Sequence, residues 1–189
     1  MSAISLPAST AIWNWLAEIP DPEVPAISIV DLGIVREVHC EEAPHGSRAV
    51  VTITPTYSGC PAMDMIATDI RAKLQARGID DVRLVTRLSP AWTTDWLSAD
   101  ARERLRRFGI APPAQQAIRF DRESTGPRPA RSGDPLHFLF PRTRASAAVA
   151  CPRCASTDTE SISEFGSTAC KAQYRCRACR EPFDYFKPI

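Results

Sequence analysis

The sequence predicts an α+β fold, in which a small α/β domain with a hairpin, a helix, a strand and a second helix precedes a metal-stapled β ribbon. Helical and strand periods fill the first 110 residues, five of the seven cysteines lie in the last forty, and a proline- and arginine-rich stretch separates the two. A chain of 189 residues has room for one good-sized core or two modest ones. We therefore expect a domain over 1–110, a connector over 111–149 and a ribbon over 150–189.

The composition is that of a globular protein. The 23 basic and 22 acidic residues give a formal net charge of +1, which argues against attraction of the whole molecule to nucleic acid. No apolar run approaches the ~18 residues of a membrane helix, and the N-terminus has no signal-peptide pattern. We expect a cytoplasmic protein with no membrane or nucleic-acid partner.

The first elements follow from apolar spacing. Ile12, Leu16 and Ile19 form one helical stripe, which predicts a short helix over 9–19 that ends at Asp21-Pro22. Two strand-like runs, 34–40 and 48–54, flank a turn-prone segment at 43–47, and this pattern is typical of a hairpin with a longer loop.

The clearest helix begins at Pro61. Ala62, Ile66, Ile70 and Leu74 recur every four residues until Gly78, which favours a C-terminal cap. The alternating pattern at 82–88 then predicts a third strand. A last helix is expected between a capping serine at 98 and a glycine at 109.

The connector has no sustained period. Its one apolar segment, 136–140, is a possible strand added to either neighbouring domain. Acidic residues exceed basic ones up to residue 110, and the reverse holds afterwards, so the two halves of the chain are expected to attract each other.

Four C-terminal cysteines have the spacing of a structural zinc site. They form two Cys-x-x-Cys pairs about 21 residues apart. About forty residues cannot bury enough surface to fold alone, whereas structural zinc supplies roughly 10–16 kcal/mol in small finger peptides. Iron bound by the same four sulfurs and a redox dithiol stay open as alternatives. The predicted ligands are Cys151, Cys154, Cys176 and Cys179.

Cys170 is a fifth thiol in this region. A strand over 168–176 would place it on the same face as Cys176. It is then either a buried structural thiol or a thiol that approaches the metal or lines an interface.

Cys60 is the candidate site of the first domain. It lies at the predicted N-cap of the long helix, where the amides of Ala62 and Met63 favour a thiolate by less than one pKa unit. Acidic residues in upstream loops, Asp21, Glu23 and Asp31, would oppose that effect if they packed nearby. A soft metal displaces the thiol proton outright. The residues thus favour a metal or cluster ligand over a hydrolytic nucleophile, with a buried capping residue as the alternative.

No catalytic array accompanies Cys60. The histidines lie in a strand, a turn and the connector, without a metal or nucleophile motif, at positions 39, 45 and 137. Two tryptophans at 92 and 96 indicate either core packing or a protein interface. Four arginines between 102 and 107 indicate a solvated face or a docking patch for an acidic partner.

Several segments together resemble known families. The segments 21–25, 28–35 and 56–61 resemble the SufT-like metal-sulfur cluster biosynthesis domain, whose members assist iron-sulfur protein maturation. The segments 89–96, 162–168 and 174–179 are similar to PaaD, the accessory subunit family of the bacterial phenylacetyl-CoA ring epoxidase. The resemblance covers most of the chain except the connector.

The resemblance implies a helper that loads or maintains a metal centre and has no independent catalysis. Cys60 corresponds to the reactive cysteine of the domain, which implies a role as a transient ligand of iron or an iron-sulfur cluster. The acidic motif of the domain corresponds to Asp21, Glu23 and Asp31. The implied partners are the oxygenase or its reductase; a permanent structural subunit is the alternative role. Such chains usually end in Phe-Lys-Cys, but here Pro188 follows Lys187. No role for that last thiol is carried over.

Overall fold

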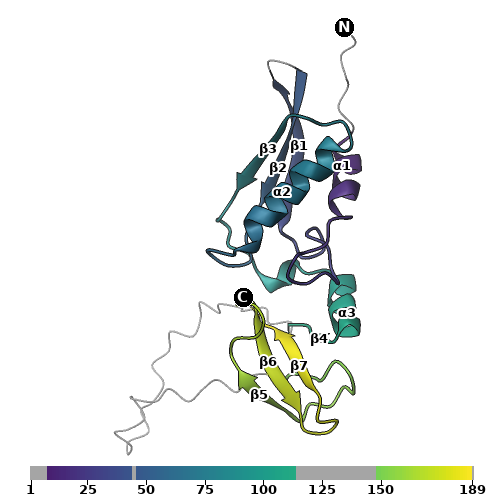
Figure 1. Ribbon diagram of the computed structural model, residues 1–189, viewed down its shortest axis with the longest axis vertical. Helices are drawn as coiled ribbons and strands as arrows, with labels where there is room; N and C mark the ends of the chain where they lie inside the picture. Colours follow the sequence, from purple (N-terminus) through teal and green to yellow (C-terminus); the bar gives the residue numbers. More distant parts are fainter. Residues whose placement is uncertain (1–7, 44–45, 114–147, 189) are drawn as a thin grey trace, which may run out of the picture.

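The computed structural model describes residues 8–43, 46–113 and 148–188 (Figure 1). The predicted connector, including the possible strand at 136–140, thus falls almost wholly outside the described residues. His45 and His137 also lie outside them. The α+β class predicted from the sequence is confirmed: an upper domain built on one sheet precedes a ribbon built on another.

The first domain contains the predicted hairpin. Strands β1 (Val35–Ala43) and β2 (Gly46–Ile53) pair antiparallel, and β3 (Val82–Thr86) lies parallel to β2. Helix α2 (Ala62–Gln75) makes the crossover that a parallel pair requires. Its apolar residues at four-residue spacing are buried, as the sequence pattern predicted.

Helix α1 (Ser9–Leu16) is shorter than predicted, because turns replace the helix after Leu16. Ile19 is nevertheless buried, at 5% exposure. The end of α2 agrees with the expectation: Gly78 has φ +83°, and the Ile79 amide donates to the Leu74 carbonyl at 3.0 Å. This pattern closes a helix with a left-handed glycine.

A short helical segment joins the two domains. It consists of the 3₁₀ turn η1 (Thr94–Trp96) and helix α3 (Ala99–Phe108). Ser98 Oγ accepts a hydrogen bond from the Ala101 amide at 3.0 Å, and Gly109 ends α3 with φ +93°. Both predicted caps are therefore confirmed.

The ribbon sheet has the order β4-β7-β6-β5. Its own strands are β5 (Thr159–Ser163), β6 (Lys171–Cys176) and β7 (Pro182–Phe186), and they pair antiparallel. Strand β4 (Ile110–Ala111) comes from the end of the first domain and lies parallel to β7 (Figure 1). It crosses the domain boundary expected at residue 110. A strand of two residues is too short to show an alternating pattern, so the sequence could not predict it.

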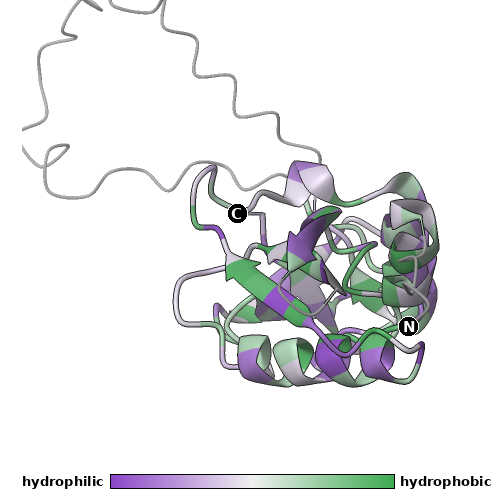
Figure 2. Cartoon of the chain, turned by 90° about the horizontal axis from the view of Figure 1, so that it is seen from above, coloured by the Kyte–Doolittle hydropathy of each residue, from purple (hydrophilic) through white to green (hydrophobic). Residues whose placement is uncertain are grey.

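The ribbon packs against the first domain, and the two share a hydrophobic core. Cys170 and Phe186 belong to the core that contains α1, α2 and the first sheet. The ring centroids of Trp92 and Phe186 are 6.1 Å apart. The ribbon also has a small core of its own, which contains Cys151 and Cys176. Figure 2 shows hydrophilic and hydrophobic residues along the same helices, as expected where one face of each is buried.

Candidate metal sites

The ribbon brings its four predicted cysteines together. Their Sγ atoms all lie within 4.8 Å of one another, with 3.8 Å between Cys151 and Cys179 and 3.5 Å between Cys154 and Cys176. Four sulfurs at the usual Zn–S distance of about 2.3 Å from a tetrahedral ion are about 3.8 Å apart. The donor set therefore fits a structural zinc ion.

Backbone amides prepare this cluster for metal. The Cys179 amide lies 3.5 Å from Cys176 Sγ and donates to it. This hydrogen bond is the largest contribution that lowers the pKa of Cys176 to about 7, with further contributions from Cys154 and Cys179, while burial and the other cysteines raise the pKa of Cys179 to about 12. A thiol with such a pKa gives up its proton readily to a binding cation.

Cys60 lies in the loop that leads into α2. The helix begins at Ala62 with Pro61 as its N-cap, so the predicted N-cap at Cys60 was wrong by one residue. Pro61 already adopts right-handed helical dihedral angles, which sequence spacing alone does not reveal. Cys60 is half-buried and packs against the first core. Its thiol is therefore partly open to solvent.

The surroundings of Cys60 keep its thiol protonated at rest. Burial raises the pKa of Cys60, and the charge of Glu23 raises it further, while the Ala62 amide lowers it. The amide at the helix start therefore lowers the pKa of Cys60 by less than burial raises it, in line with the small dipole contribution expected from the sequence. The Tyr57 side chain is hydrogen-bonded to Cys60, and burial raises the pKa of Tyr57 to about 12.

Asp21 shapes the loop that presents Glu23. Its Oδ1 accepts hydrogen bonds from the amides of Glu23 at 3.0 Å and Val24 at 2.8 Å. Asp21 is only 4% exposed, and burial raises its pKa although these two amides oppose the effect. Its carboxylate thus fixes a turn, while the Glu23 carboxylate contacts the Cys170 thiol and its charge acts on Cys60.

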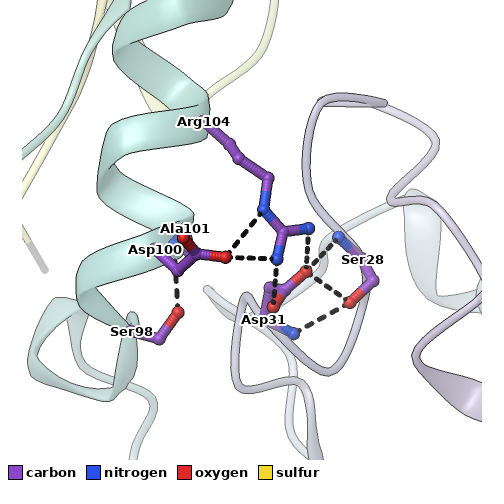
Figure 3. A network of polar contacts seen from close by, with 6 residues as sticks. All are labelled: Ser28, Asp31, Ser98, Asp100, Ala101 and Arg104. Atoms are coloured by element: carbon purple, nitrogen blue, oxygen red, sulfur yellow. Dashed lines mark hydrogen bonds and ion pairs between the residues drawn. The ribbon is translucent and has the colours of Figure 1, made fainter. Parts of the chain in front are cut away.

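Asp31 lies in a different polar network (Figure 3). Its carboxylate accepts hydrogen bonds from Ser28 Oγ at 2.8 Å and from Arg104 Nη1 at 2.9 Å. Arg104 of α3 also binds Asp100 at 2.8 Å. The partners recorded for Asp31 are thus in its own turn and in α3, so it ties that turn to the helix.

Cys170 lies where the ribbon meets the first domain. It directly precedes β6, is 4% exposed, and has its Sγ 3.7 Å from Glu23 Oε2. Thr168 Oγ1 is 3.0 Å from the same sulfur. Burial raises the pKa of Cys170 to about 11, with a further contribution from the charge of Glu23. The structure thus brings Glu23 and Cys170 into contact, with Cys60 in electrostatic range of Glu23, and Cys170 is not part of the group formed by the four ribbon cysteines.

The two tryptophans have different environments. Trp92 is buried at 3% exposure, and its Nε1 donates to the Leu32 carbonyl at 2.9 Å. Trp96 is half-buried under the Arg36 guanidinium, 3.4 Å from the ring centroid. Trp92 therefore packs in the core, as the first of the two sequence-based alternatives expected, and it also contacts Phe186 of the ribbon.

The four arginines of α3 are paired within the chain. Arg102 donates to the carbonyls of Thr94 and Pro113, and Arg106 and Arg107 bind Glu103. Arg104 binds Asp31 and Asp100. The pairs with Asp100 and Glu103 have the i,i+3 and i,i+4 spacing of one helix, whereas Asp31 and the two carbonyls come from outside α3.

Sequence reasoning missed Tyr57 and Lys171 as members of the site. Lys171 is 5% exposed, and its Nζ donates to the Glu23 carbonyl at 3.3 Å. A lysine that opens a strand beside a cysteine gives no local signal of this contact, because its partner is 148 positions away in the chain.

One metal-binding group is already assembled in the described part of the chain. Within residues 8–43, 46–113 and 148–188, the ribbon cysteines are the one group of three or more His, Cys, Asp or Glu side chains placed to hold an ion. In the same ranges, no helix combines the length and apolar content needed to cross a bilayer.

Two protein families match consecutive parts of this chain. Residues 9–85 match the family described as "Iron-sulfur cluster assembly protein", and residues 139–187 match the "PaaD zinc beta ribbon domain". A crystal structure of the domain of unknown function DUF59 from Bacillus anthracis has a TM-score of 0.46 and 27% identity, covering 51% of this chain and 90% of that one.

Two relatives match this chain over different lengths. The Porphyromonas gingivalis "Fe-S protein maturation auxiliary factor" is 32% identical over 91 residues, 48% of this chain and 83% of the relative. An Escherichia coli K12 protein, named as a subunit of a "Putative 1,2-phenylacetyl-CoA epoxidase", is 47% identical over 189 residues, 100% of this chain and 98% of the relative. Full-length identity at this level, with a zinc-ribbon match over four assembled cysteines, confirms the resemblance: the chain belongs to the PaaD family of phenylacetyl-CoA epoxidase subunits.

Proposed function

We propose that this protein is a maturation factor for the phenylacetyl-CoA epoxidase system. In this role Cys60 transiently binds iron or an iron-sulfur cluster and delivers it to a client, the oxygenase or its iron-sulfur reductase. The protein catalyses no reaction on phenylacetyl-CoA. It acts in the cytoplasm, where a reducing environment keeps its thiols free.

The observation that carries the proposal is the environment of Cys60. Its thiol is half-buried just before α2 and lies within electrostatic range of the Glu23 carboxylate. A thiol kept protonated by burial and a neighbouring carboxylate is a poor resting nucleophile. It is a suitable transient ligand, because an incoming cation displaces the proton and is attracted by the same carboxylate.

The acidic residues have separate roles in this proposal. Glu23 supplies the charge beside the thiol, and Asp21 holds the turn that presents Glu23. Asp31 acts at a distance, since it fixes its turn to α3 through Arg104. The ribbon, held by zinc in our proposal, presents the surface that docks the client.

A comparison of client metal content tests the proposal. The oxygenase and reductase would be purified from cells that carry the natural chain, Cys60→Ser or Cys40→Ser, and their iron and sulfide measured per protein. Cys40 is exposed on β1 and provides the matched control. We expect several-fold less iron in the client with Cys60→Ser and normal iron with Cys40→Ser. Fully loaded, active client from the Cys60→Ser cells would contradict the proposal.

A permanent structural subunit is the second candidate, because the Escherichia coli relative is named as a subunit. This role predicts that the protein co-purifies with the oxygenase at a fixed ratio after the client is loaded. It also predicts that Cys60→Ser leaves both the complex and its iron content unchanged. A maturation factor should instead dissociate from the loaded client.

A further inference from the structure

We propose that Cys170 of the ribbon and Glu23 join Cys60 in one interdomain site that takes up a thiophilic divalent cation, ferrous iron. This inference rests on the proposed function, because it names the other donors at the place where Cys60 acts. It also gives the ribbon a role beyond docking: it contributes a ligand to the site of the first domain.

Cys170 is separate from the ribbon's own metal cluster. The four ribbon cysteines gather around their own small core, whereas Cys170 is buried in the core of the first domain. It is 4% exposed, yet its sulfur has polar neighbours: Glu23 Oε2 at 3.7 Å and Thr168 Oγ1 at 3.0 Å. A thiol that serves packing alone is surrounded by apolar atoms.

Glu23 is held in place by both domains. Asp21 Oδ1, in the first domain, accepts a hydrogen bond from the Glu23 amide. Lys171 Nζ, in β6 of the ribbon, donates a hydrogen bond to the Glu23 carbonyl. Lys171 is almost fully buried, with Asp184 Oδ2 at 3.9 Å. Burying a lysine is unfavourable unless it is paired, so the contact fixes the ribbon at this loop.

Cys60 lies in the same small region. It packs against the core that buries Cys170. The Tyr57 hydroxyl hydrogen-bonds to Cys60 and lies within electrostatic range of Cys170 and Glu23. The charge of Glu23 also acts on both thiols. The Glu23 carboxylate therefore contacts Cys170 and lies within electrostatic range of Cys60, a cysteine of the other domain.

This donor set suits a transient cargo. Two thiolates and a carboxylate bind borderline-soft divalent ions and leave a fourth position for a ligand of the client. On binding, each S–H bond is replaced by a sulfur–metal bond and two protons pass to water; no electron is transferred. The Lys171 ammonium offsets part of the added negative charge. Client thiolates then take the ion by ligand exchange.

The backbone beside Cys60 has open space at Gly59. Gly59 has φ +80°, and a Cβ atom built on it would meet no heavy atom within 4 Å. The chain beside Cys60 is thus unhindered on that side, and the conformation there favours glycine. The site closes when the metal arrives, unlike the ribbon cluster, which is already assembled.

A cobalt titration tests the site directly. The full chain, with zinc in its ribbon, would be titrated anaerobically with Co²⁺, which zinc outcompetes at a four-thiolate site. The readouts are the thiolate-to-cobalt charge-transfer band, the metal count per chain and competition by Fe²⁺. We expect one Co²⁺ beyond the zinc, with affinity reduced on the order of tenfold or more in Cys60→Ser, Cys170→Ser and Glu23→Gln. Cys40→Ser should bind as the natural chain does.

The outcomes separate this inference from the proposed function. Loss of binding in Cys60→Ser but not in Cys170→Ser or Glu23→Gln would overturn the interdomain site and leave Cys60 as a ligand. Absence of any second metal would overturn both. If Cys170→Ser strongly lowers the thermal unfolding temperature, its loss of cobalt binding could reflect unfolding. The cobalt affinity of Glu23→Gln then tests the interdomain site, because this variant retains both thiols and nearly the same shape.

Discussion

The two thiol sites of this protein differ in how far they are prepared for metal. In the ribbon, four sulfurs already lie at the distances of a tetrahedral site. At the junction, Glu23 contacts Cys170, but these two residues and Cys60 are not yet assembled as a group of three donors. A site assembled in advance suits metal that stays, and a site that must first close, as we propose for the junction, suits metal that leaves.

The largest expected effect is zinc removal from the ribbon. Chelation, or Cys176→Ser, should unfold β5–β7, because the small ribbon core is centred on the cysteines and zinc supplies on the order of 10 kcal/mol in such modules. The first domain should stay folded but lose stability, because β7 contributes Phe186 to its core. Amide resonances in heteronuclear NMR spectra would follow the two domains separately. A dispersed ribbon spectrum in fully demetallated protein would remove the contrast between the two sites.

Loss of the shared aromatic contact comes next. Phe186→Ala should lower the free energy of unfolding by roughly 3–5 kcal/mol, as for other buried aromatics, because Phe186 is 1% exposed and packs against Trp92. Urea unfolding measures this loss. Phe165→Ala is the matched control: Phe165 is 69% exposed near Lys187, and we expect a change within about 1 kcal/mol. Equal losses in both variants would mean that the junction is not a packed core.

Alkaline pH should weaken the junction before the metal-loaded ribbon. The pKa of Cys170 rises from 9.0 to about 11 on folding. Between these values the unfolded chain has lost the proton and the folded chain retains it, so stability is full below about pH 9 and falls as the pH rises toward 11. The slope is at most about 1.4 kcal/mol per pH unit. The difference in urea midpoint between the natural chain and Cys170→Ala, followed from pH 8 upward, isolates this contribution from lysine titration. A constant difference would contradict it.

The smallest expected effect concerns Arg104. Its ion pairs with Asp31 and Asp100 are partly exposed, and such pairs contribute roughly 0.2–1 kcal/mol. Arg104→Ala should therefore lower stability slightly, by an amount that shrinks in high salt. Arg107→Ala, which removes a more exposed pair with Glu103, should change stability less. A loss of several kcal/mol in Arg104→Ala would give Asp31 a larger part in the framework than we propose.

Local patterns predicted most of the elements. The four-residue spacing of apolar residues in α2 and the capping positions Ser98 and Gly109 all depend on neighbours within a few positions. The ribbon cysteines likewise form two short motifs, so their assembly was predictable from spacing. The start of α2 was wrong by one residue, because helix termini depend on dihedral angles that several residue types adopt.

The junction could not be predicted from the sequence. Cys170 and Glu23 are 147 positions apart, and Lys171 and Glu23 are 148 apart. Neither contact has a period or a motif, since both follow from the way in which two folded units meet. Two arginines of α3 show the same limit: their charge pattern indicated a solvated face or a docking patch, but Arg102 binds the Pro113 carbonyl and Arg104 binds Asp31, both outside the helix.

Strand β4 has a consequence for how the ribbon can be handled. A β-strand at the border of a sheet exposes unpaired backbone groups that recruit other chains. The first domain supplies β4 to cover that border along β7. A ribbon produced without residues 110 and 111 would expose this border and self-associate, so biochemical work on the zinc module requires the preceding helix and strand to remain attached.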